Sequence, residues 1–538
     1  MDEASTSCQY NFNLTLTDWI IVYEPNRKVK NDLTNFKSLI ERISNEGFNL
    51  RTKKFGKNSL VIFLHCPNKV LAIQAYKSKL DDWVHHIGDN VKKPQPITEE
   101  NYNLVADTLK PAERLRLIFD ILVYPSFKGG IGLQVGFNCT DFFAPHDEAF
   151  NEAWINNWNQ KLLLHDEDFD IIRDNLGETV AFYFAFLQFY FKSLIIPALV
   201  GCLSFFFDLK FSVTFGVFLV TYGLVFILRW EKNEVVWATK WGTKNINKKK
   251  IHRPDFKYTE LKVDPVTSEI TPFYPTGKRM AKILCITLPV LILSTILVTI
   301  FVAANLAFEM YITLYYKGPY PQIVQLIPLL SYGASIPTFN AFYSSMMVGL
   351  NKFENRPTEK EFTYSLTQKV FLILSLVNFL DLIFVGFWFI PFNDVFRDYL
   401  KSFGFLVWDG QKNLNLEFGP NFLTSRLISF IITGQVLNTF LEVGLPYLIS
   451  KLSASTKKLA EKEKLNEDLM DLDEEEKKFF FRVLKEYKLP KQDNFNDYAE
   501  LISQFGNIVL FSICWPPTAI FCFINNFIEL RSDAIKVA

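Results

Sequence analysis

Five acidic residues and one asparagine lie within or at the ends of three apolar segments late in the sequence, where they could bind a cation. These residues are Asn438, Glu442, Asp497, Glu500, Glu529 and Asp533. The two residues in each segment are three or four positions apart, which places them on one face of a helix. A carboxylate in a membrane helix costs roughly 2.5 to 3.5 kcal/mol, and no comparable set of Lys or Arg lies among these acids. Because clustered carboxylate and amide oxygens suit a hard cation, the pattern favours Ca²⁺ before Mg²⁺.

A simpler interpretation competes for two of these acids. Lys536 lies three residues after Asp533 and could pair with it, and Asp497 could cap its helix. That interpretation leaves the three glutamates of the set unexplained. The sequence therefore favours a metal site.

The elements that must position the acids are three apolar helices. About the last forty residues predict two helices folded against each other, with a break near Pro516 and Pro517. One pair of acids stands where the first helix begins and another where the second ends, so a hairpin brings all four to one side of a membrane. Residues 425–449 predict a third apolar helix, which carries Asn438 and Glu442.

The composition is that of a membrane protein. Residues 283–308 are almost wholly apolar, and a bilayer is crossed by about 20 apolar residues. The formal net charge is zero, so the chain has no electrostatic footprint for a nucleic-acid partner. The sequence contains neither a Walker loop nor a nucleophile and base at suggestive spacing, which points to transport rather than to an enzyme.

The N-terminal part alternates between strand and helix patterns in the order β-α-β-β-α. This order predicts a cytosolic α+β domain of the ferredoxin-like type over residues 1–150. Residues 151–178 then predict amphipathic helices before the membrane. They lie either at the membrane surface or packed on the soluble domain.

Residues 179–538 predict a polytopic α-helical membrane domain with eight spans and a charged cytosolic helical insert at 452–495. The loop 231–279 is rich in Lys, so the positive-inside rule places it in the cytosol. Two spans precede that loop, which also puts the N-terminus in the cytosol. With this topology, all five acids of the metal site lie at the same depth. The first six spans are expected at about 177–207, 211–230, 281–308, 323–350, 366–391 and 424–450.

Polar residues also recur inside several spans. Small hydroxyl residues often mediate plain helix packing in membranes, whereas intramembrane acids usually face a water-filled path. Together they could line a polar furrow through which a lipid headgroup or an ion moves. The candidate furrow residues are Glu309, Ser331, Ser335, Thr338, Asn378 and Asp381.

Five stretches resemble the anoctamin (transmembrane protein 16) family, in particular its fungal Ca²⁺-activated lipid scramblases. They are TLKPAERLRLIFDIL, GETVAFYFAFLQFYF, YKGPYPQIVQLIP, NTFLEVGLPYLI and NNFIELRSDAIKVA. The resemblance covers nearly the whole chain. It implies two Ca²⁺ ions per chain between helices six, seven and eight, on the six oxygen-bearing residues named above.

The resemblance also implies a membrane-exposed groove built from helices three to seven. Glu309 matches an acid at its outer mouth, and Gly434 falls where helix six can hinge. Phe422 stands where an Arg is common in the family, with Arg426 one turn away. The family has ten spans, of which eight are present here, and its last helix forms the homodimer contact, so a homodimer is doubtful for this chain.

We therefore expect an integral membrane protein of the endoplasmic reticulum or plasma membrane. Its expected function is Ca²⁺-activated movement of phospholipids between leaflets without ATP, together with non-selective ion conduction. Two alternatives stay open. The spans could merely anchor a tether at a membrane contact site, or the protein could be a Ca²⁺-activated chloride channel.

Overall fold

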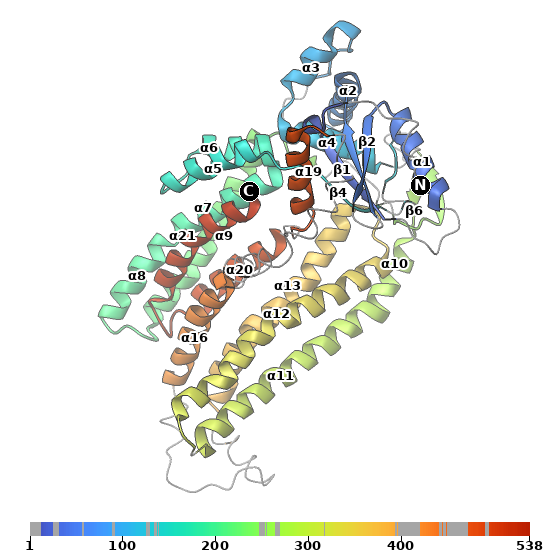
Figure 1. The fold of residues 1–538 in the computed structure, drawn as a ribbon. Helices are drawn as coiled ribbons and strands as arrows, with labels where there is room; N and C mark the ends of the chain where they lie inside the picture. The colour runs from blue at the N-terminus through green and yellow to red at the C-terminus, as the bar shows by residue number, and fades with distance from the viewer. Residues whose placement is uncertain are drawn as a thin grey trace.

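The computed structural model of this chain combines an N-terminal sheet with a larger set of long helices (Figure 1). The structure describes residues 12–24, 32–55, 59–88, 92–124, 130–133, 137, 139–246, 253, 255–263, 270–316, 318–392, 395, 420–440, 444, 448, 472–489 and 494–538.

The N-terminal sheet has the strand order β2-β3-β1-β4, with every neighbouring pair antiparallel. In the central strand, Ile21 pairs with Ile62 on one side and with Phe142 on the other. The expected N-terminal α-β domain is confirmed. Its strands are β1 (Trp19–Tyr23), β2 (Asn49–Phe55), β3 (Ser59–His65) and β4 (Cys139–Phe143), and its helices are α1 (Asp32–Asn45), α2 (Asn68–Val84), α3 (Tyr102–Thr108) and α4 (Pro111–Val123).

Both faces of this sheet are covered. Successive residues of a strand point to opposite faces, and in β1 Ile21 and Tyr23 pack with α1, α2 and α4. Ile20 and Val22 point the other way, toward a helix from much later in the chain. That helix is α19 (Glu474–Glu486), which lies beside the sheet in Figure 1.

Helix α19 attaches to the sheet through apolar and ionic contacts. Its Phe479, Phe480 and Val483 are buried against the second face. Glu476 Oε1 pairs with Arg51 Nη1 at 2.7 Å and accepts a hydrogen bond from the Leu14 backbone N–H at 3.0 Å. The sequence predicts that charges of the 452–495 insert mostly mark a solvated face. In α19 this holds for every charged residue except the buried Glu476, because the others are exposed or half-buried while the opposite face covers the strands.

We expect Glu476→Ala to loosen this attachment. The substitution leaves a buried backbone N–H and a half-buried guanidinium without their shared acceptor, at a cost of about 1 to 3 kcal/mol. Hydrogen–deuterium exchange of the amides in residues 12–17 should accelerate. Glu475→Ala, at the exposed neighbouring position, is the control. Equal exchange in both variants would contradict the role given to Glu476.

Four helices of the described part are long and apolar enough to cross a membrane, judged by length and composition: Glu178–Phe206, Val213–Lys240, Thr276–Glu309 and Glu359–Phe389. They agree with the first, second, third and fifth predicted spans. The fourth predicted span lies within the long helix α12, which is not among these four.

The sixth, seventh and eighth predicted spans overlap the described helices α16, α20 and α21, and the last two of these are separated around Pro516 and Pro517 as expected. The helices of this part are α5 (Glu148–Gln160), α6 (Asp166–Leu176), α7 (Glu178–Ser193), α8 (Ile195–Phe206), α9 (Val213–Lys240), α10 (Thr276–Lys282), α11 (Leu288–Tyr315), α12 (Pro321–Glu354), α13 (Glu359–Ile383), α16 (Pro420–Thr439), α20 (Asn494–Phe511) and α21 (Thr518–Val537).

The helix α5 packs on this helical part. Trp154 and Trp158 are both buried, and each meets the Phe184 ring of α7 edge to face. The Trp158 indole N–H also donates to the Leu530 carbonyl of α21 at 2.9 Å. These contacts join α5, α7 and α21 in one core, which holds α21 in place.

Candidate functional site

The paired helices α20 and α21 place three of the predicted metal ligands around one tyrosine and the fourth beside one of these three. Asp497 lies in the first turn of α20, and the Tyr183 hydroxyl of α7 donates to Asp533 of α21. Asp497 and Glu529 are also close enough to Tyr183 to act on it electrostatically. Glu500 lies within hydrogen-bonding reach of Glu529. Negative charge from two helices is thus gathered in one region of the bundle.

Within the described ranges, Lys536 brings its positive charge to this set of acids. Lys536 Nζ pairs with Asp497 Oδ1 at 2.7 Å, so the lysine that was considered as a partner of Asp533 contacts Asp497. The second oxygen of Asp497, Oδ2, is buried and has no hydrogen-bond partner among the described residues. A buried carboxylate oxygen without a donor is costly, so this atom favours an additional cation or donor.

The contribution of α16 is only partly described. The backbone of α16 includes Asn438, but its side chain lies outside the described residues, as does all of Glu442. Among the residues that are described, no group of three or more His, Cys, Asp or Glu side chains is arranged to hold a metal ion. The four acids of α20 and α21 are therefore gathered but not closed around a single point.

Sequence reasoning missed three uncharged side chains at this site. Tyr183 donates to Asp533, and Asn525 and Gln504 both donate to Glu529 Oε1, at 2.5 and 3.2 Å. Two of them carry a local signal that could have found them. Asn525 precedes Glu529 by four residues and Gln504 follows Glu500 by four, so each shares a helical face with an acid.

The two acids of the predicted furrow meet a single arginine. Arg426 of α16 donates to both carboxylate oxygens of Asp381 in α13, at 2.5 and 2.7 Å, and also to Glu309 of α11. The Asp381 side chain is 0% exposed and that of Arg426 is 1% exposed. In this arrangement the acids tie three helices together (Figure 1).

The other furrow residues differ in their surroundings. The Ser331 hydroxyl donates to the Pro328 carbonyl at 2.7 Å, and that of Ser335 donates to the Tyr332 carbonyl at 2.6 Å. These two hydroxyls therefore satisfy the backbone of their own helix. Thr338 is exposed. Asn378 is half-buried, and its amide donates to Ser503 Oγ of α20 at 2.7 Å.

Gly434 lies in α16 at a half-buried position. A Cβ built there would meet no described atom within 4 Å. Close packing among the described residues therefore does not require glycine at this position. A role in helix bending remains the prediction for Gly434.

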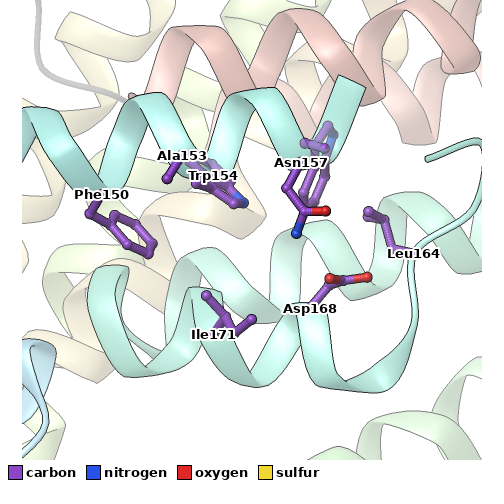
Figure 2. Close-up of a pocket in the computed structure, with 8 residues that line it drawn as sticks. Phe150, Ala153, Trp154, Asn157, Leu164, Asp168 and Ile171 are labelled. Carbon is purple, nitrogen blue, oxygen red and sulfur yellow. The ribbon is translucent and has the colours of Figure 1, made fainter. Parts of the chain in front are cut away.

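A pocket of about 180 Å³ lies between the facing sides of α5 and α6 (Figure 2). Its wall is mainly aromatic and aliphatic, with Asp168 at one end. The Asp168 carboxylate already pairs with Lys161 at 2.6 Å and caps the start of α6. The pocket therefore shares no lining residue with the acids of α20 and α21.

Comparisons with known proteins cover both parts of the chain. A model of the anoctamin family, described as calcium-activated chloride channel, matches residues 172–538. A model described as an alpha-beta plait domain in TMEM16 lipid scramblase matches residues 16–140. An uncharacterised protein of Schizosaccharomyces pombe is 24% identical over 96% of this chain and 77% of its own length.

Human anoctamin-10 is 26% identical over 76% of this chain and 56% of its own length. Mouse anoctamin-8 is 24% identical over 65% of this chain and 30% of its own length. The chain thus spans a little over half the length of the anoctamin-10 proteins that it matches.

Proposed function

The chain belongs to the anoctamin family, and from this premise we propose that it is a Ca²⁺-activated phospholipid scramblase that also conducts ions. It is an integral membrane protein of a family that includes lipid scramblases and chloride channels. The proposal extends to a ferredoxin-like N-terminal domain on the cytosolic side. The strand order β2-β3-β1-β4 supports that fold.

The observation that carries the proposal is the gathering of carboxylates on α20 and α21 around a buried oxygen that has no donor among the described residues. Asp497, Glu500, Glu529 and Asp533 supply four carboxylates, against the single ammonium of Lys536 that the described contacts place there. Carboxylate and amide oxygens are the ligands that Ca²⁺ takes in proteins. Asn438 and Glu442 of the α16 segment would complete the set. The donor set therefore fits Ca²⁺.

When bound, Ca²⁺ supplies positive charge that offsets the mutual repulsion of the acids. We propose that the protein responds to this change in charge by moving helix α16. The acids on α20 and α21 would repel the carboxylate of Glu442 when their charge is not offset, and this repulsion would fall once the charge is offset. Two packings of α16 then differ in ligand affinity, which is the condition for a ligand to shift their populations.

The outer part of α16 is where that movement would reach the lipid path. Arg426 joins α16 to α11 and α13 through Glu309 and Asp381. These ion pairs hold α16 against α11 and α13, so separating the helices means breaking the pairs. A route for headgroups therefore requires α16 to shift relative to these partners, with Ser335, Thr338 and Asn378 lining the path.

A liposome assay tests the proposal. The purified protein is reconstituted with fluorescent phospholipids in both leaflets, and dithionite bleaching is followed with and without Ca²⁺. We expect bleaching to pass half of the label only when protein and Ca²⁺ are both present. A Ca²⁺-dependent chloride flux without lipid movement would instead favour the channel, and protein-dependent clustering of vesicles with neither activity would favour the tether.

We expect Gly434→Ala to change the Ca²⁺ sensitivity of scrambling. Alanine stabilises a straight helix by roughly 1 kcal/mol relative to glycine, and the added methyl group meets no described atom within 4 Å. If α16 bends at this residue, the variant shifts the half-activating Ca²⁺ concentration by up to about fivefold while its maximal rate stays measurable. Gly349→Ala in α12, where a Cβ also meets nothing described within 4 Å, is the control. An unchanged Ca²⁺ dose response in Gly434→Ala would contradict the prediction that α16 bends at Gly434.

A further inference from the structure

A chain of buried amides leads to one of the acids. Asn526 donates through Nδ2 to Gln504 Oε1 at 2.9 Å, and Gln504 donates through Nε2 to Glu529 Oε1 at 3.2 Å. Asn526 is 0% exposed and Gln504 is 7% exposed, so water does not compete for these groups. Asn525 donates to the same Glu529 oxygen from one helical turn away.

The direction of this chain is fixed by a backbone carbonyl. Asn526 Nδ2 also donates to the Cys522 carbonyl oxygen at 2.7 Å, and a carbonyl can only accept. The nitrogen of Asn526 must therefore face Cys522 and Gln504. Its partner atom on Gln504 must in turn be the oxygen, which leaves the Gln504 nitrogen to face Glu529. The Cys522 carbonyl therefore fixes the orientation of both amides, so that Gln504 presents its N–H group, and not its oxygen, to Glu529.

The reverse orientation would be harmful at this place. If Gln504 were turned around, its carbonyl oxygen would face the Glu529 carboxylate, and two acceptors would meet in a buried setting. Glu500 and Asp533 already act on Glu529 with like charge. Gln504 and Asn525 both donate to Oε1 of Glu529, so two fixed donors hold the carboxylate in one orientation against this repulsion.

We propose that Gln504, oriented by Asn526, is a positioning residue of the cation site, which holds the Glu529 carboxylate in its binding geometry. The inference rests on the proposed Ca²⁺ function. Neither amide belongs to the six expected ligands, and neither needs to touch the ion. Partners behind a metal ligand commonly contribute 10- to 100-fold to metal affinity.

Gln504→Met tests the inference, because methionine keeps the length of the side chain and removes both hydrogen-bonding groups. Calorimetric titration of the full chain in detergent with CaCl₂ should give a Kd raised by roughly 10-fold or more. The half-activating Ca²⁺ concentration for scrambling should rise by a similar factor, while the rate at saturating Ca²⁺ is retained. Ser512→Ala is the control, since it removes a buried hydroxyl directly after α20 that donates to the Ile508 carbonyl.

Asn526→Ser gives a second, gentler variant. A serine hydroxyl can satisfy the Cys522 carbonyl but has no further hydrogen for Gln504, so the orientation of Gln504 is released. We expect a smaller loss of Ca²⁺ affinity, of about threefold or more. If the methionine variant fails to fold, the serine variant decides the matter.

The two levels of the proposal fail in different ways. A wild-type chain that binds no Ca²⁺ overturns the proposed function itself. Wild-type binding with an unchanged Kd in both amide variants overturns the positioning role alone. A loss of maximal rate at saturating Ca²⁺, with an unchanged Kd, would show that the amides support folding and not the site.

Discussion

Replacing Arg426 by methionine is expected to lower the free energy of unfolding by about 3 to 5 kcal/mol, which is the usual cost of leaving a buried charge without its partner. Two carboxylates are affected, because Asp381 and Glu309 both depend on Arg426. Asp381 is fully buried, so water cannot replace the guanidinium there. Thermal unfolding in detergent micelles measures the effect.

The matched control is Arg279→Met. Arg279 also pairs with a glutamate, Glu361, but at 3.8 Å and with the glutamate half exposed. An exposed pair of this kind contributes about 0 to 1 kcal/mol. Equal unfolding temperatures for the two arginine variants would show that the buried triad carries no special stability.

A triple variant separates stability from function. Arg426→Met together with Asp381→Asn and Glu309→Gln removes all three charges, so no uncompensated ion remains and much of the stability should return. In this triple variant, the ion pairs that join α16 to α11 and α13 are nevertheless absent. We therefore expect scrambling at lower Ca²⁺ than in the wild type, and an unchanged Ca²⁺ dependence would contradict the idea that this link resists opening.

Glu442→Gln combined with Glu529→Gln is expected to weaken Ca²⁺ binding on the order of 100-fold or more. Ligand charge sets affinity at hard-ion sites, and this double variant removes one carboxylate from the α16 segment and one from α21. The amide side chains keep nearly the same size, so the helices retain their packing. Calorimetry on the purified protein measures the affinity directly.

Glu475→Gln serves as the control for this second prediction. It removes one carboxylate from an exposed position of α19, outside the cation site. The control should bind Ca²⁺ like the wild type. Equal affinity of the wild type and the double variant would refute the assignment of these residues as ligands.

The sequence predicted those features that follow from local periodicity and from strong breaks. The helix pair on either side of Pro516 and Pro517 is present, and so is the β-α-β-β-α succession near the N-terminus. Asp497 and Lys536 show the limit of this reasoning. Their pairing depends on how two helices rotate against each other, and helical spacing within one segment does not determine that rotation.

The buried triad could not be derived from spacing either. Glu309, Asp381 and Arg426 lie in three helices that are far apart in the sequence. Each was visible as a charge in an apolar segment, but nothing in the sequence says which charge meets which. The sequence did indicate that the second face of the sheet is covered. All of Ile20, Ile21, Val22 and Tyr23 are apolar, and an unbroken apolar run indicates a strand that is buried on both sides.

Because α19 covers the sheet, the second face of the sheet can be buried only late in synthesis, after α19 has been made. Ile20, Val22, Val61 and Phe63 are made early, but the residues that cover them, Phe479, Phe480 and Val483, leave the ribosome several hundred residues later. At about 5 to 20 residues per second, the uncovered face waits on the order of tens of seconds while the intervening helices enter the membrane. Such a face is prone to aggregate. The nascent chain therefore needs a chaperone or the membrane surface to shield it, and a fragment that ends before α19 would expose the same apolar row permanently.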